Sequence, residues 1–152
     1  MKFKIFYSLF ISLLVISLCK CDSVETKITE PDFVIDKKIF SANLEAINNN
    51  VFKIRISYLI AFHFVGQPGY ITKLTFLTEG FTSSLSMRQS APYEVGREYQ
   101  QDLGFWLPDS LNNFDTLRII FNVNGSFEIQ LKDSITYTNF VSSDSVDVNV
   151  QK

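Results

Sequence analysis

The sequence predicts an all-β domain, and three observations support this class. Large apolar residues alternate with polar ones at a period of two through most of the chain after Lys38, as they do in strands with one buried face. Glycine, proline and asparagine separate the alternating runs where turns are needed. Aromatic residues make up 14% of the 152 residues, so the chain can fill a sizeable core, and its length fits one domain.

Several alternating runs predict individual strands. Residues 52–65 place a large apolar side chain at nearly every even position, while Lys53, Arg55 and Ser57 between them are polar. This run is long for one strand, so a bulge or bend is expected inside it. Gln67-Pro68-Gly69 predicts the turn that follows. Further strands are expected over residues 70–78, 81–88 and 99–107.

Asn124-Gly125 predicts the turn of a hairpin, because this dipeptide favours tight turns and lies between two alternating runs. The residues expected in the core of this hairpin all have odd numbers: Leu117, Ile119, Phe121, Phe127, Ile129 and Leu131. A two-residue loop would pair core residues with solvent residues, so the parity predicts a three-residue loop that begins at Val123. Two more strands are expected over residues 135–141 and 145–151.

Residues 41–48 are the one helix candidate, with Leu44 and Ile47 as its apolar residues. An edge strand over residues 38–46 is the competing interpretation. A total of about seven to nine short strands with turn residues between them predicts an immunoglobulin-like antiparallel β-sandwich. The core disulfide of antibody domains is missing, because both cysteines precede residue 22. We expect residues 38–152 to form the sandwich domain.

Residues 1–21 are predicted to be an export signal. Lys2 and Lys4 form a short positive region, and residues 5–18 are apolar apart from three serines. These 14 residues are fewer than the ~20 that a membrane-spanning helix needs, so we favour removal of the segment over its retention as an anchor. Residues 22–37 are expected to form a polar tether or a frayed terminus.

Cys19 and Cys21 are candidate lipidation sites. Residues 18–21 resemble a bacterial lipoprotein box, in which a cysteine becomes the lipidated first residue of the mature chain. The residue before that cysteine should be small, whereas here it is Leu18 or Lys20. Simple cleavage after Cys19 or Cys21 is the other interpretation. The expected location is therefore the cell envelope under lipidation, or the exterior under cleavage.

The charge of the chain argues against nucleic-acid binding. The chain has 14 cations and 16 anions, and three of the cations lie before Cys21, so the remainder carries a net charge of −5. Such a domain lacks the basic surface that phosphate backbones require. Anionic membrane surfaces are disfavoured for the same reason, so contact with a membrane is expected only through a lipid anchor.

No catalytic, cofactor or metal motif is predicted. His63 is the only histidine, so a zinc cluster would lack partners and a structural role is favoured. Carboxylate pairs such as Glu94 with Glu98, or Glu98 with Asp102, fit solvated positions better than a glycosidase site. The acidic segment 109–115 does not have the spacing of an EF-hand calcium loop.

Trp106 is the best candidate contact residue. Parity places it with Asp102 and Gly104 on the face of its strand opposite the core. A tryptophan beside a glycine can stack on a sugar ring or anchor a protein partner; cover by a loop or by the N-terminal segment is the alternative. Arg88, on the polar face of another strand, is a second candidate. Asn124 begins an Asn-Gly-Ser glycosylation sequence.

We therefore expect a non-enzymatic, exported β-sandwich that acts as a binding or interaction module of the cell envelope or the extracellular space, with a protein or carbohydrate partner. Three alternatives stay open: a carbohydrate-binding module that uses Trp106, a subunit of an envelope assembly, and a hydrolase with an unrecognised site. An assembly subunit predicts an uncovered apolar patch or a long unpaired strand edge. A hydrolase predicts a cleft at His63 or at two carboxyls.

Overall fold

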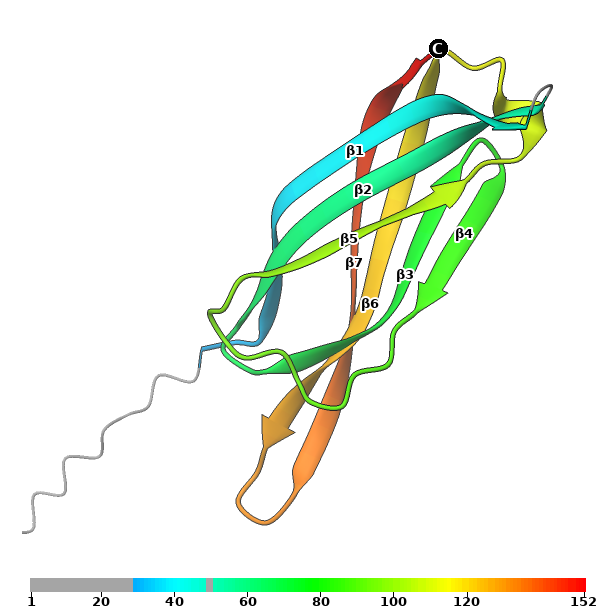
Figure 1. Ribbon diagram of the computed structural model, residues 1–152. Helices are drawn as coiled ribbons and strands as arrows, with labels where there is room; N and C mark the ends of the chain where they lie inside the picture. Colours follow the sequence, from blue (N-terminus) through cyan, green and yellow to red (C-terminus); the bar gives the residue numbers. More distant parts are fainter. Residues whose placement is uncertain (1–28, 49–50) are drawn as a thin grey trace, which may run out of the picture.

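The computed structural model describes residues 29–48 and 51–152. These residues form seven β-strands and one 3₁₀ helix, which confirms the all-β class (Figure 1). The elements are β1 (Asp32–Asn48), β2 (Val51–Val65), β3 (Gly69–Thr78), β4 (Phe81–Ser86), β5 (Tyr99–Trp106), η1 (Asp109–Leu111), β6 (Thr116–Gln130) and β7 (Ile135–Gln151). The strands expected over residues 52–65, 70–78, 81–88 and 99–107 are confirmed, with small shifts at their ends. Within the described ranges, no helix is long and apolar enough to cross a membrane.

The seven strands form one sheet in the order β4-β3-β6-β7-β1-β2-β5. Neighbouring strands are antiparallel except β1 and β7, which are parallel where Ala42 pairs with Val150 and Asn43 with Gln151. The sheet curls into a half-barrel, so that β1, β2 and β5 lie over β7, β6, β3 and β4 (Figure 1). The sheet is therefore mixed, and its concave side encloses the core.

The core follows the period-two alternation of the sequence. Even-numbered side chains of β2 and odd-numbered side chains of β6 point into the half-barrel. Their buried members are Ile54, Ile56, Tyr58, Ile60, Phe62, Phe64, Leu117, Ile119, Phe121, Val123 and Phe127. Aromatic rings meet across the two halves of the sheet: the ring centres of Phe40 and Phe121 are 5.4 Å apart, and those of Tyr58 and Phe76 are 4.5 Å apart. These rings hold the curled sheet closed on itself.

The first strand corrects the expectations for the N-terminal part of the domain. The helix over residues 41–48 is wrong, because this stretch belongs to β1, pairs with β2 and buries Ala42 in the core. The competing strand is right in conformation, but β1 is not an edge strand, since it lies between β7 and β2. Residues 32–37, expected in the tether, are also strand. Phe33 explains this early start, because its ring lies 5.3 Å from that of Phe64.

The predicted hairpin turn at Asn124-Gly125 is wrong, because β6 continues through both residues. Gly125 occupies an inward position, where a Cβ atom would lie 2.2 Å from the carbonyl oxygen of Tyr70 and 2.5 Å from the ring of Phe140. Close packing, and not a turn, therefore requires this glycine. A three-residue loop and an uninterrupted strand preserve the same parity, so the alternation of the sequence fits both.

The turns of the structure lie elsewhere. The β6–β7 hairpin reverses between Leu131 and Ser134, where the N–H of Leu131 donates to the carbonyl oxygen of Ser134 at 2.8 Å. The turn predicted at Gln67-Pro68-Gly69 is confirmed between β2 and β3. Glu79 and Gly80 join β3 to β4, and both have positive φ angles, of 44° and 80°. This is the type I′ geometry that matches the twist of paired strands.

Candidate functional site: a projecting hairpin

The tip of the β6–β7 hairpin extends beyond the rest of the sheet. β3 pairs with β6 only as far as Phe127, opposite Gly69, whereas β6 and β7 continue to pair up to Gln130 and Ile135. Figure 1 shows the tip in orange, projecting below the other strands. Residues 128–138 are therefore held mainly by one another.

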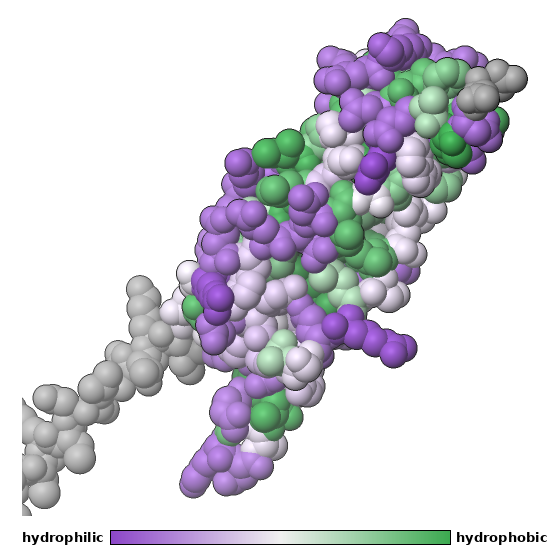
Figure 2. All heavy atoms as spheres, in the orientation of Figure 1, coloured by the Kyte–Doolittle hydropathy of each residue, from purple (hydrophilic) through white to green (hydrophobic). Residues whose placement is uncertain are grey.

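Large apolar side chains of this hairpin are exposed to solvent. The exposed fractions are 50% for Leu131, 49% for Ile135, 56% for Tyr137 and 67% for Val141. Ile135, Tyr137 and Val141 share the outer face of β7, because the odd-numbered residues here alternate with the inward Phe140. Leu131 lies at the turn. We call these four residues the hairpin surface. Figure 2 shows hydrophobic groups between polar ones in this projecting part.

Two tyrosines and a carboxylate border the hairpin surface. The hydroxyl of Tyr70 on β3 donates a hydrogen bond to Glu128 on β6 at 3.0 Å. The rings of Tyr70 and Tyr137 have centres 6.2 Å apart and an interplanar angle of 59°. Burial and the bond to Glu128 raise the pKa of the Tyr70 hydroxyl, so it remains a neutral donor at physiological pH. The bond fixes Tyr70 against the base of the hairpin.

One edge of β7 has no strand partner over most of its length. β6 pairs with β7 throughout, but on the other side, within the described residues, β1 pairs only with the last residues of β7. Lys38 of β1 forms an ion pair with Asp144 and also donates to the carbonyl oxygen of Ser145 at 3.3 Å. The hydrogen bond from Lys38 and one from the Ser145 backbone lower the pKa of Asp144. These contacts close the gap at Ser145, and on this edge they leave residues 135–143 without a paired strand among the described residues.

Trp106 lies on the outer face of the edge strand β5, as its parity predicts, and 42% of it is exposed. Arg55 stands opposite on β2, and its guanidinium carbon lies 5.6 Å from the ring centre of Trp106, close enough for a cation–π contact. The aromatic ring pairs of the described residues do not include Trp106. Arg88 follows β4, which is at the other end of the sheet order from β5. The two predicted contact residues therefore belong to opposite edges of the sheet, Trp106 on β5 and Arg88 just after β4.

The glycosylation candidate lies within the described residues, whereas the two lipidation candidates do not. Asn124 lies half-buried in the middle of β6, between Lys73 of β3 and Val141 of β7. Its carbonyl oxygen accepts a hydrogen bond from the hydroxyl of Thr72 at 3.1 Å. Cys19 and Cys21 lie outside the described residues, as does the whole predicted export signal.

His63 lies on the outer face of β2 and contacts Asp36. Its Nδ1 atom is 2.8 Å from the Oδ2 atom of Asp36. A bulge in β1 produces this contact, because the register shifts between Ile35 and Lys37 and leaves Asp36 as the extra residue. The irregularity expected in β2 is thus found in its neighbour. A histidine that is half-exposed and bonded to one carboxylate fits the structural role favoured by the sequence.

The acidic residues considered as catalytic or calcium-binding candidates contact neighbouring polar groups. The contacts are Glu94–Arg97 at 3.4 Å, Glu98–Gln100 at 3.2 Å, Asp109–Lys53 at 3.4 Å and Asp115–Lys152 at 2.7 Å. The hydrogen bond from Lys152 lowers the pKa of Asp115. In the part of the chain that the structure describes, no group of three or more His, Cys, Asp or Glu side chains is arranged to hold a metal ion.

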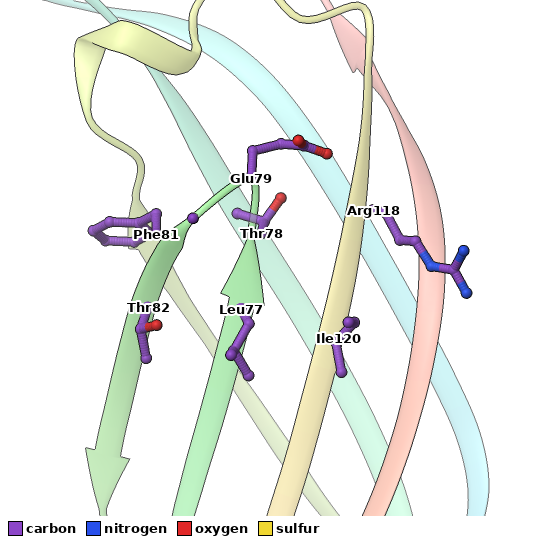
Figure 3. Close-up of a pocket in the computed structure, with 8 residues that line it drawn as sticks. Leu77, Thr78, Glu79, Phe81, Thr82, Arg118 and Ile120 are labelled. Atoms are coloured by element: carbon purple, nitrogen blue, oxygen red, sulfur yellow. The ribbon is translucent and has the colours of Figure 1, made fainter.

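A shallow hollow of about 410 Å³ lies at the turn between β3 and β4. Leu77 of β3 and Ile120 of β6 pair beneath it, and Glu79 and Arg118 border it (Figure 3). Figure 3 shows that Arg118 extends away from the turn, so charged groups do not converge on the hollow. Binding sites for small molecules combine an apolar wall with convergent polar groups. We therefore place the candidate site at the hairpin surface.

The hairpin surface does not follow from the sequence, because the alternation places the turn at the wrong residues. With a turn at Asn124-Gly125, Leu131 was expected in the core, whereas half of it is exposed beside the observed turn. The polar triplet Lys132-Asp133-Ser134 between two alternating runs is the signal that marks the true reversal.

Fold and site together define only a class: an all-β half-barrel with an exposed, projecting hairpin. A scan against models of protein families gave no match, and neither a search of curated proteins nor a search of solved structures gave one.

Proposed function

We propose that this chain is an exported, non-enzymatic interaction module that docks onto a protein partner through the hairpin surface, as a component of the cell envelope or the extracellular space. One observation carries the proposal: Ile135, Tyr137 and Val141 are 49 to 67% exposed on the outer face of β7, in a hairpin whose tip projects beyond the sheet. Apolar groups gathered on the outside of a folded domain mark contact sites. Tyrosine is also among the residues that dominate binding energy at interfaces.

The surroundings of the hairpin surface support a protein partner. Its apolar centre is bordered by polar groups, among them Glu128 and Lys132. An apolar centre inside a polar rim is the usual anatomy of a protein–protein interface. The net charge of −5 after Cys21 opposes nucleic acid and anionic lipid as partners. Of the alternatives that the sequence leaves open, this arrangement favours a subunit of an envelope assembly.

Export is part of the proposal and is supported by the sequence of residues 1–21. The positive start and the apolar run of residues 5–18 have the layout of a signal peptide. The intact mass of the mature chain distinguishes the two forms of processing. A diacylglyceryl adduct on Cys19 or Cys21 identifies a lipid-anchored protein, whereas an unmodified chain that starts at Lys20 or Asp22 identifies a freely secreted one. A mature chain that retains residues 1–18 contradicts export by cleavage.

The proposal includes an immunoglobulin-like relation for the fold. Support comes from the strand pairing, in which β1-β2-β5 form one half of the curled sheet and β7-β6-β3-β4 the other. These sets correspond to the A-B-E and G-F-C-C′ pairings of immunoglobulin-like sandwiches, with C′ in place of a D strand. Modules of this architecture commonly present their binding residues on loops or exposed strands, as the projecting hairpin does here.

A photo-crosslinking residue tests the proposed function. Benzoylphenylalanine in place of Tyr137 should form a discrete adduct when cells that make the chain are irradiated, because Tyr137 lies at the centre of the hairpin surface. Phe52 is the matched control, since it is an aromatic residue that is 50% exposed at the start of β2, away from the hairpin. The proposal fails if position 137 yields no adduct, or the same adducts as position 52.

Carbohydrate binding at Trp106 is the second candidate function, favoured by the exposure of this ring on the outer face of β5. Arg55 already occupies one side of the ring, so a sugar must use the other side or displace the guanidinium. Trp106 is the only tryptophan, so its fluorescence reports binding directly. Titration with glucan, chitin and mannan oligosaccharides should quench and shift the emission if the ring stacks on a sugar. Unchanged emission with all three sets excludes these sugars as ligands of Trp106.

A further inference from the structure

We propose that the partner of the hairpin surface is a second copy of this chain, which adds its own β7 antiparallel to residues 135–143 about a two-fold axis at Asn139. This inference rests on the proposed function and names its partner. It also extends the half-barrel across two copies, because each β7 would pair with β6 on one side and with the other β7 on its second side.

The hydrogen-bonding phase of β7 shows which of its backbone groups point away from β6. The N–H of Leu131 donates to the carbonyl oxygen of Ser134, and the N–H of Val150 to that of Asp115. In an antiparallel ladder hydrogen-bonded residues alternate, so even-numbered residues of β7 bond to β6. Odd-numbered residues therefore direct their N–H and C=O groups to the open edge. Between the turn and Ser145 these residues are Ile135, Tyr137, Asn139, Val141 and Ser143.

Two contacts set the far end of this open edge. The N–H of Ser145 donates to the Asp144 carboxylate at 2.7 Å, and its carbonyl oxygen accepts from Lys38 at 3.3 Å. Both backbone groups of Ser145 are therefore already engaged on this edge. Beyond it, β7 pairs with β1 at Val150. The segment available to a second copy is residues 135–143.

A symmetric antiparallel pair that uses all of this segment has one register. Its two-fold axis passes at Asn139, so Ile135 stands opposite Ser143 of the second copy, and Tyr137 opposite Val141 of the second copy. Tyr137 and Val141 are the most exposed apolar side chains of the hairpin, at 56% and 67%. An aromatic ring opposite a β-branched side chain is a favourable cross-strand pair. This register brings Ile135, Tyr137 and Val141 of the two copies side by side on one continuous sheet face.

The composition of the segment favours self-pairing. Edge strands that must stay single carry charges, prolines or bulges, whereas residues 135–143 contain no charge and no proline. The β6–β7 ladder also runs without a register shift. Two copies of an acidic domain can therefore meet along this edge without placing like charges opposite each other.

Disulfide trapping tests the register, in a full-length chain whose Cys19 and Cys21 are replaced by serine. Asn139→Cys should give a covalent dimer under mild oxidation, because residues paired across the axis have Cα atoms roughly 5.5 Å apart, within the range of a disulfide. Ser143→Cys is the matched control on the same edge, since its two copies would lie roughly 27 Å apart. Equal trapping at both positions, or none at position 139, overturns the proposal.

Sedimentation equilibrium gives an independent measurement. Val141→Lys places a charge opposite Tyr137 of the second copy and should weaken dimerisation at least about tenfold. Ile39→Lys is the control, because Ile39 is 48% exposed on β1 outside the segment, and it should leave the dimer unchanged. A monomer at all concentrations overturns the proposal. If Tyr137 then crosslinks to a different protein, the proposed function stands without self-pairing; if it crosslinks to nothing, both fail.

Discussion

Gly125 provides the sharpest test of the fold, because the sequence and the structure give it different roles. In a hairpin turn this glycine would adopt a left-handed conformation, which asparagine tolerates well. In the structure it is an inward residue of β6, and its φ angle is not positive. Gly125→Asn therefore distinguishes the two roles: it is mild in a turn and severe in a packed strand.

The size of the effect follows from the contacts that a Cβ atom would make. At position 125 this atom would lie 2.2 Å from the Tyr70 carbonyl oxygen and 2.5 and 2.6 Å from two carbons of the Phe140 ring. Favourable contacts between carbon atoms lie at ~3.5–4.0 Å. The carbonyl group cannot retreat easily, because Tyr70 pairs with Ser126 in the β3–β6 ladder. Forcing extra atoms into a well-packed site costs about 1–3 kcal/mol and occasionally more, and the clash with the backbone carbonyl places this site at or above the upper end.

Equilibrium urea unfolding followed by circular dichroism measures the free energy of unfolding. We expect Gly125→Ala and Gly125→Asn to lower it by about 3 kcal/mol or more, a large part of the ~5–15 kcal/mol of a typical domain. Gly80→Asn is the control. It has a φ of 80° and no atom within 4 Å of an added Cβ, so the cost should stay near 1 kcal/mol or below. A Gly125→Asn variant within about 0.5 kcal/mol of wild type would refute the packed-strand role.

Three further predictions concern ionisation and turn geometry. Lys38→Met removes the contact that lowers the pKa of Asp144, so the free energy of unfolding of the variant should be up to about 1 kcal/mol below that of wild type at neutral pH. This difference should vanish as the pH falls below 3.8 and through the lowered pKa, because Asp144 is then protonated in both proteins. A difference that persists in acid contradicts the prediction. Burial, with the nearby Asp102, raises the pKa of Tyr58 to about 12, so stability should fall as the pH rises from 10 toward 12, and Tyr58→Phe should reduce this loss in urea unfolding at alkaline pH. Glu79→Asn should raise the free energy of unfolding by about 0.5–1 kcal/mol, because asparagine adopts positive φ more readily; a loss of stability would contradict the type I′ turn.

The alternation of apolar residues predicted most strands and their faces, because successive side chains of a strand point to opposite faces and only one face is buried. It could not predict the course of the chain at Asn124-Gly125. A glycine in a turn and a glycine under an aromatic ring look the same in sequence, and Phe140, which decides between them, is 15 residues away in the chain. The strand from Asp32 was missed for a similar reason, since its partners Phe62 and Phe140 come from other strands.

The candidate site was harder to predict than the fold. The alternation of side chains along β5 correctly predicted that Trp106 lies on the outer face of this strand. The strand expected over residues 135–141 came with no assignment of its faces, and the place of Tyr137 on a projecting hairpin depends on β3 ending at Gly69 while β6 and β7 continue. Where a neighbouring strand stops is a property of the whole sheet. The sequence of one strand therefore does not predict where the neighbouring strand ends.

The projecting hairpin cannot be explained by the stability of the fold. The last close ring contact of the core at this end joins Phe127 and Phe140, whose centres are 4.8 Å apart, and Ile129 is only half-buried. Beyond them the two strands contact mainly each other, and a two-stranded ribbon is marginally stable in water. An uncharged edge with exposed Tyr137 and Val141 is also a hazard for uncontrolled association. A turn just after Phe127 would keep the core and avoid this hazard. The longer hairpin is therefore best understood as a surface that is covered when the protein acts.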